Sequence, residues 1–197
     1  KATNRLGRIA DGTTLLDYAA DEVTRQITIN LTLAQFEWQG HKVNLLDTPG
    51  YPDFVGDVHS ALRVADSALL LVRGASGVEV GTEVIWEVVR KEKSPVVAVV
   101  NMMDKEHADF DAAVRSLRER LGLNAVPVQL PIGQAETFQG VVDLVHHRAW
   151  RFAGKDMEEK SEPIAVPDDM KDAVAAARNQ LLEEAATGDE ALMNKFL

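Results

Sequence analysis

Two short apolar runs constrain the fold of this chain more than any other feature. Residues 67–72 and 95–100 have the length of strands, and residues 79–91 between them carry apolar side chains at helical spacing. Uniformly apolar strands separated by amphipathic helices indicate a parallel sheet that is covered on both faces. A helix over residues 108–121 and a strand over residues 126–130 continue the alternation. The sequence therefore predicts an α/β fold with a mostly parallel sheet and helices on both faces.

A hairpin is predicted before these runs. An alternating pattern begins at Ile27 and changes phase at Leu33–Ala34, which predicts a strand with a bulge. Gln39-Gly40 then forms a tight turn, and Lys42–Asp47 returns as the partner strand. Residues 1–26 are polar and show no sustained period, so we expect them to form a loop.

The partner strand ends at an acid that is followed by a Pro-Gly turn. Asp47 lies at the carboxyl edge of the predicted sheet, where open α/β sheets bind ligands, and a carboxylate there can hold Mg²⁺ through water. Gly50 adds an N–H group that an anion can approach closely, because no Cβ intervenes. An acidic turn without a ligand is the alternative interpretation. Asp53 is then predicted to cap a helix over residues 54–65.

A second polar cluster follows the next buried strand. The apolar run 95–100 ends in Asn101-Met102-Met103-Asp104, so the clusters 47–51 and 101–104 are expected on one rim of the sheet. Residues 7–14 nearly match the phosphate-binding pattern G-x-x-x-x-G-K-[ST]. Thr13 replaces the lysine, however, and no apolar strand precedes the stretch, so we reject it as a phosphate loop.

The alternation stops beyond Pro131. A short strand is predicted over residues 139–145, and a charged connection over residues 153–167 leads to a helix over residues 168–186. Gly188 is expected to end that helix, and a further helical start follows over residues 189–197.

Composition and charge narrow the functional class. The chain has a net charge of −10, which argues against a broad electrostatic grip on nucleic acid. Residues 151–197 carry 6 basic and 11 acidic side chains, a net charge of −5, so this region is expected to face solvent or a basic protein partner. No apolar run is long enough to span a bilayer, and no secretory leader is visible. The chain has no cysteine, which fits a cytoplasmic protein.

Several stretches match one protein family in the same order along the chain. They are Arg25-Gln26-Ile27-Thr28-Ile29, Asp47-Thr48-Pro49-Gly50-Tyr51, Asn101-Met102-Met103-Asp104, and the segment 126–133 with its continuation 140–144. The first three correspond to R-G-I-T-I, D-T-P-G-H and N-K-M-D, and the last leads into an inserted subdomain. The chain therefore resembles the GTP-binding domain of translation elongation factor G, and the resemblance covers essentially all 197 residues.

The resemblance implies a domain organisation. Residues 1–132 would form an incomplete GTP-binding core, with the first switch region in residues 1–30 and the second in residues 47–65. Residues 133–197 would form the inserted subdomain, cut off at its carboxyl end. The family's first strand and phosphate loop are absent from the sequence, so we expect the 197 residues alone neither to fold cooperatively nor to bind GTP tightly.

The resemblance also implies a chemistry, namely binding and hydrolysis of GTP on the ribosome with GTP/GDP and Mg²⁺ as cofactors. Thr28 and Asp47 would hold the metal ion, and the Gly50 N–H would contact the γ-phosphate. Asp104 would accept two N–H bonds from guanine, and Asn101 would tie the neighbouring loops together. The nucleotide-binding residues would be Asp47, Thr48, Pro49, Gly50, Tyr51, Asn101, Met102, Met103 and Asp104.

Three residues depart from the family pattern. Tyr51 stands where the family has the histidine that orients the attacking water, Met102 replaces a lysine, and Gln26 replaces a glycine. A phenol can hydrogen-bond water but cannot become the cation that imidazole can. The alternative function is therefore a degenerate relative that binds the ribosome or a protein with little or no GTPase activity. An unrelated nucleotide-binding α/β domain would leave the segment 126–144 unexplained.

Overall fold

The computed structural model describes residues 7–152, 161–187 and 192–194. The chain divides into two units. The first comprises Lys1–Leu70 and Glu79–Val97, and the second comprises Leu71–Val78 and Ala98–Leu197. Within the described ranges, no helix combines the length and the apolar character that a membrane-spanning segment needs.

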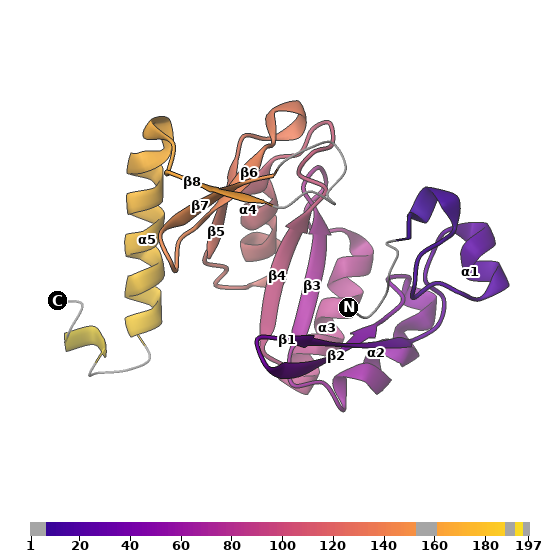
Figure 1. Ribbon diagram of the computed structural model, residues 1–197. Coiled ribbons are helices and arrows are strands. Elements are labelled where there is room, and N and C mark those ends of the chain that lie inside the picture. The colour runs from indigo at the N-terminus through magenta and orange to yellow at the C-terminus, as the bar shows by residue number, and fades with distance from the viewer. Residues whose placement is uncertain (1–6, 153–160, 188–191, 195–197) are drawn as a thin grey trace. The chain divides into compact units, whose positions relative to one another are not determined.

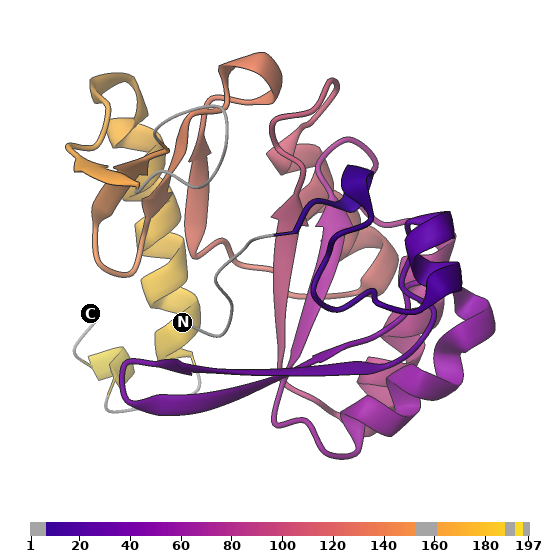
Figure 2. The ribbon, with the colours of Figure 1, turned by 45° about the vertical axis from the view of Figure 1, so that its right-hand side comes forward.

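The first unit is built on a long hairpin and a pair of helices (Figures 1 and 2). Its helices α2 and α3 pack against each other and bury valine and alanine side chains on their facing sides. The helix predicted over residues 79–91 is confirmed as α3. The elements of this unit are η1 (Ile9–Asp11), α1 (Ala20–Arg25), β1 (Thr32–Trp38), β2 (His41–Asp47), η2 (Pro52–Phe54), α2 (Val55–Leu62) and α3 (Val80–Glu92).

The hairpin differs from its prediction in two respects. β1 and β2 pair antiparallel without interruption, from Thr32 opposite Asp47 to Trp38 opposite His41, so the predicted bulge at Leu33–Ala34 is wrong. The apolar phase changes because both faces carry exposed apolar side chains; Leu33 is 61% exposed. The strand also begins at Thr32 rather than at Ile27, because the N–H groups of residues 29–31 donate to carboxylates instead of a neighbouring strand.

Two helix starts also differ from the prediction. The segment 1–26 was expected to be loop, but within the described part it contains α1, whose six residues are too few to show a period. Asp53 does not cap α2. It lies inside the 3₁₀ turn η2, which begins at Pro52, where the fixed φ of proline favours the first turn.

The two apolar runs form β3 (Ala68–Arg73) and β4 (Val96–Asn101), which are hydrogen-bonded neighbours in a two-stranded sheet. The N–H of Ala68 donates to the carbonyl of Pro95 at 2.9 Å, and the N–H of Gly74 donates to that of Asn101 at 2.8 Å. These bonds advance in the same direction along both strands, as in a parallel pair. The prediction of one mostly parallel sheet is nevertheless wrong for the described residues, in which β1–β2 and β3–β4 are separate sheets.

The second unit contains a four-stranded antiparallel sheet, in the order β5-β6-β7-β8, that packs on helix α5 (Figure 1). The strand predicted over residues 126–130 is therefore not part of a parallel sheet; it is β5, paired with β6. Strands β7 and β8 were not predicted, because each has four residues or fewer. The remaining elements are α4 (Phe110–Leu121), β5 (Gln129–Ile132), η3 (Ala135–Thr137), β6 (Gly140–Asp143), β7 (Arg148–Arg151), β8 (Glu162–Ile164), η4 (Asp168–Met170) and α5 (Lys171–Ala186).

An apolar core holds this sheet and its helix together. Val142, Leu144 and Ala149 are fully buried and contact Val174 of α5, which is also buried. Burial of branched apolar side chains on the sheet face and on one side of the helix supplies the main stabilisation of such a layer. The helix predicted over residues 168–186 is confirmed as η4 and α5. Gly188 and most of the predicted helical start at residues 189–197 lie outside the described residues.

Candidate functional site

Asp47 is the last residue of β2, as the sequence predicts, and it lies opposite Thr32 at the end of the hairpin. Thr48 is half-buried, and Pro49, which is buried, turns the chain away from the strand. Gly50 is exposed, and a Cβ built on it would meet no atom within 4 Å, so there is open space on that side of the residue. The turn after β2 thus presents a half-buried carboxylate and an exposed glycine.

The surroundings of Asp47 are negatively charged. Burial raises the pKa of its carboxyl group above the ordinary value, and the nearby Asp17 and Glu22 carboxylates raise it further. Across the hairpin, the hydroxyl of Thr32 is buried and has no hydrogen-bond partner among the described residues. A cation at this position would offset the repulsion between the carboxylates, although the described residues contain no group of three or more acidic, histidine or cysteine side chains arranged to hold a metal ion.

Thr28 is held by an acid that the sequence did not single out. Its hydroxyl donates to one carboxylate oxygen of Asp17 at 2.8 Å, and the hydroxyl of Thr14 donates to the other at 3.2 Å. Asp17 therefore connects the beginning of the loop to the threonine that the family motif marks. A hydroxyl that donates to a carboxylate keeps its lone pairs available, so Thr28 can still act as a metal ligand.

Glu22 holds the backbone before α1 and after Thr28. Its side chain is only 1% exposed, and it accepts hydrogen bonds from the N–H groups of Ala19, Ile29 and Asn30 at 2.9–3.1 Å and from the Asn30 amide. Burial alone would raise its pKa, but these donors outweigh that effect and lower the pKa to about 2. Glu22 therefore ties α1 to the residues that follow Thr28. No local pattern could have marked it, because its partners are set by the tertiary fold.

Two of the residues that differ from the family motifs, Gln26 and Tyr51, lie in the first unit. Gln26 ends α1 with φ of 56°, in the left-handed region that favours the glycine found at this position in the family. The side chain of Tyr51 is 53% exposed at the start of η2. The phenol is therefore accessible from solvent beside the turn of Asp47 and Gly50.

The second predicted cluster belongs to the other unit. Asn101 is the last residue of β4, and its side-chain oxygen accepts from the N–H of Met102 at 2.8 Å. Met102 has φ of 59° and its side chain is 44% exposed, whereas Met103 is only 6% exposed. Asp104 pairs with Lys105 at 2.8 Å, and this hydrogen bond lowers the pKa of the Asp104 carboxyl group. The carboxylate is exposed and ionised at neutral pH, as recognition of two N–H donors requires.

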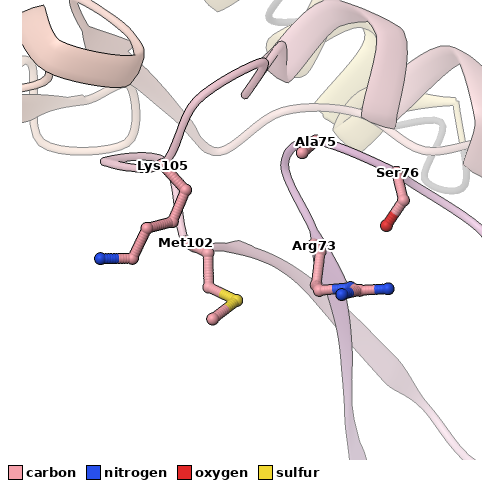
Figure 3. A pocket seen from close by; sticks show the side chains of 5 residues that line it. All are labelled: Arg73, Ala75, Ser76, Met102 and Lys105. Carbon is pink, nitrogen blue, oxygen red and sulfur yellow. The ribbon is translucent and has the colours of Figure 1, made fainter.

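A pocket of about 240 Å³ lies beside this cluster (Figure 3). Arg73, the last residue of β3, lines it together with Ala75 and Ser76 of the following turn, and Met102 and Lys105 line it from the turn after β4. The sequence analysis singled out Met102 but missed Arg73, because an arginine at a strand end has no motif of its own. The two predicted clusters therefore lie in different units of the chain. Thr28 and residues 47–51 lie in the first unit, and residues 101–104 lie in the second.

Residues 1–190 match the family described as the elongation factor Tu GTP binding domain. This chain belongs to that family. Over 194 residues it is 39% identical to elongation factor G of Mycoplasma pneumoniae and, equally, to elongation factor G of Gluconobacter oxydans, matches that cover 98% of this chain. The predicted resemblance to elongation factor G is therefore confirmed.

The match to solved structures agrees with this assignment. The crystal structure of a protein from Thermus thermophilus superposes on this chain with a TM-score of 0.90 and 34% sequence identity. The alignment covers 99% of this chain and 29% of that protein. The chain likewise spans 28% of the length of each of the two elongation factors G. The mixed α/β fold is thus that of a GTP-binding domain found within longer proteins.

Proposed function

We propose that this chain is the GTP-binding and GTP-hydrolysing part of an elongation factor G-like protein that acts on the ribosome in the cytoplasm. One observation carries the proposal: each of the two family motifs begins on the last residue of a strand, Asp47 on β2 and Asn101 on β4. Carboxyl ends of strands are where α/β sheets bind ligands. Both motifs therefore have the local structural setting that nucleotide binding requires.

Thr28 and Asp47 would hold Mg²⁺ in the proposed site. Hydroxyl and carboxylate oxygens are ligands that this ion prefers, and it is commonly held by one or two protein groups together with phosphates. The negative surroundings of Asp47 fit a cation. When bound, the ion would offset the negative charge of the phosphates. The N–H of Gly50, an exposed residue with open space on its Cβ side, would contact the γ-phosphate, and Thr48 and Pro49 would shape the turn.

Asp104 would select guanine. An ionised carboxylate accepts two N–H bonds from one edge of that base, whereas adenine lacks those donors and would leave the charge unpaired. The hydrogen bond from Lys105 lowers the pKa of the Asp104 carboxyl group, and Asn101 fixes the start of the loop through its bond to the Met102 N–H. Met103, which is buried, anchors the loop from beneath.

Two residues, Tyr51 and Met102, favour an alternative function. Tyr51 would orient the attacking water in place of the family's histidine, although a phenol with a pKa of about 10 is a weak base at neutral pH. Met102 adds an uncharged thioether where the family has a lysine. A degenerate relative that binds the ribosome or a protein, with little or no GTPase activity, is therefore the alternative.

The domain organisation is part of the proposal. Residues 1–132 would belong to the GTP-binding core, with switch regions 1–30 and 47–65, and residues 133–197 to the inserted subdomain. In the described residues β2 pairs only with β1, and β3 only with β4, so each of these strands has an edge with which the family's first strand could pair. The 197 residues alone would then be inactive. A contact between the acidic residues 151–197 and a basic protein rests on their charge alone.

Binding and turnover in the full-length protein test the proposal. A fluorescent GDP analogue should bind in the presence of Mg²⁺, and unlabelled GTP and GDP, but not ATP, should displace it. GTP hydrolysis should then rise when ribosomes are added. Guanine-nucleotide binding without ribosome-stimulated hydrolysis would favour the degenerate relative. A protein that binds no guanine nucleotide would overturn both functions.

A further inference from the structure

The pocket beside Met102 has a composition that the motifs do not explain. Two cationic side chains, Arg73 and Lys105, line it together with the apolar Met102 and the small residues Ala75 and Ser76. Figure 3 shows Met102 just after the end of β4 and Arg73 at the end of β3, with the guanidinium of Arg73 extending to the side of Ser76. A thioether and a guanidinium can each lie against a flat ring, because both groups are polarisable and weakly hydrated.

The backbone holds the two sides of this pocket in place. The N–H of Gly74 donates to the Asn101 carbonyl at 2.8 Å, and the Gly74 carbonyl accepts from the N–H of Asp109 at 3.0 Å. A Cβ built on Gly74 would lie 2.8 Å from the sulfur of Met103 and 3.2 Å from the Cβ of Ala108, so glycine at this position leaves room for both side chains. The backbones of Arg73 and Met102, which neighbour this contact, are thereby held close together.

The two cations of the pocket are not equivalent. The ammonium of Lys105 is 2.8 Å from the carboxylate of Asp104, so the two groups form an ion pair. Arg73 carries the planar cation, which can lie flat on a nucleobase.

We infer that Arg73 binds the purine base of a guanine nucleotide by stacking its guanidinium on the ring beside Met102. The inference rests on the proposed function, because it assigns a further residue to the same nucleotide site. Asp104 would accept hydrogen bonds from the edge of the base, while Arg73 and Met102 cover its face. Arg73 of the neighbouring strand β3 would thus supply a cation where Met102 replaces the lysine of the family.

The test measures the Kd for GDP and for GTP in the full-length protein by displacement of a fluorescent GDP analogue. Arg73→Ala should weaken both nucleotides by the same factor, about tenfold, because a stacked base typically contributes about 1–3 kcal/mol and the phosphates are not involved. Arg73→Gln keeps a planar end without the charge and provides the same comparison if the alanine variant does not fold. Arg115→Ala, which removes an exposed arginine of α4, is the matched control and should leave both Kd values unchanged.

A second variant separates binding from folding. Met102→Lys should recover most of the affinity lost in Arg73→Ala, because the new cation can then cover the base. Wild-type binding of GDP with an unchanged Kd in Arg73→Ala or Arg73→Gln would overturn the inference and leave the proposed function standing. A larger loss for GTP than for GDP would place Arg73 on the phosphates and would also overturn it. Absence of wild-type GDP binding would overturn both.

Discussion

The hydroxyl of Thr28 donates to the carboxylate of Asp17 at 2.8 Å, across 11 residues of chain. The other oxygen of the same carboxylate accepts a hydrogen bond from the hydroxyl of Thr14, so both carboxylate oxygens of Asp17 are held. A hydroxyl that donates a hydrogen bond to a carboxylate is oriented and becomes a better electron donor. In the proposed metal site, Asp17 would therefore be a positioning residue for Thr28.

Substitution of Asp17 should change the response to Mg²⁺. In the full-length protein, we expect Asp17→Ala to raise the Mg²⁺ concentration needed for half-maximal GTP binding by about tenfold, because partners of metal ligands typically contribute about 10–100-fold to metal affinity. Asp17→Asn should have a smaller effect, since its amide oxygen can accept the same bond. Titration of Mg²⁺ against fluorescent GTP analogue binding measures the change. Equal Mg²⁺ curves for the wild type and Asp17→Ala would contradict the assigned role.

Glu22 should make the loop around Thr28 sensitive to acid. Its pKa is lowered from 4.5 to about 2, so its contribution to stability is complete above about pH 4.5 and is lost as the pH falls toward 2. Glu22→Gln at neutral pH should destabilise the loop by on the order of 2 kcal/mol, because an amide cannot accept all of these bonds. Hydrogen–deuterium exchange of residues 27–31 should therefore be faster in the variant.

The pH dependence distinguishes this role from simple packing. At about pH 3, the difference in exchange between the wild type and Glu22→Gln should shrink, since the wild-type contribution is by then partly lost. Glu119→Gln, on the exposed side of α4, is the control and should exchange like the wild type. A difference that stays constant from neutral pH to about pH 3 would show that the charge of Glu22 does not hold the loop.

Base selection should depend on Asp104. Asp104→Asn in the full-length protein should weaken GDP and favour XDP, because the added carbonyl of xanthine can accept from the asparagine amide. Titration calorimetry with both nucleotides measures the preference, and Asp111→Asn of α4 serves as the control. If Asp104→Asn still prefers GDP, another residue reads the base.

The phenol of Tyr51 should contribute little to hydrolysis. It is 53% exposed and is a weak base at neutral pH, so Tyr51→Phe should change ribosome-stimulated turnover by less than about tenfold. Tyr51→His, which introduces the family's residue, should raise turnover above that of the wild type. A loss of about a hundredfold in Tyr51→Phe would instead make the hydroxyl a catalytic group.

Features set by local pattern were predictable from the sequence. The helix α4 was predicted over residues 108–121 and is observed as Phe110–Leu121, because its apolar side chains repeat at the helical period along its own length. Strands β3 and β4 were predicted because each is a short continuous apolar run, but the expected burial on both faces is wrong, since Leu69 and Val97 are 59% and 53% exposed. The positions of Asp47 and Asn101 then followed, because each ends a predicted strand.

Features set by distant partners were not predictable. Strand β1 begins at Thr32 because the carboxylates of Glu22 and Asp57 take the preceding N–H groups, and no local pattern signals such a competition. The proposed roles of Asp17 and Arg73 arise in the same way, from contacts that the fold creates between segments. The antiparallel pairing of β5 was missed because its strand period is the same in either direction.

The adjacent methionines of the second cluster differ sharply in access to solvent, with Met102 44% and Met103 6% exposed. Oxidants convert exposed thioethers to sulfoxides first, and a sulfoxide is polar and chiral where the thioether was apolar. A peroxide would therefore modify Met102 before Met103, altering the pocket wall while the buried anchor against Gly74 stays intact. The replacement of lysine by methionine at this position thus gives the proposed nucleotide pocket a chemical vulnerability, and methionine sulfoxide reductases could reverse it.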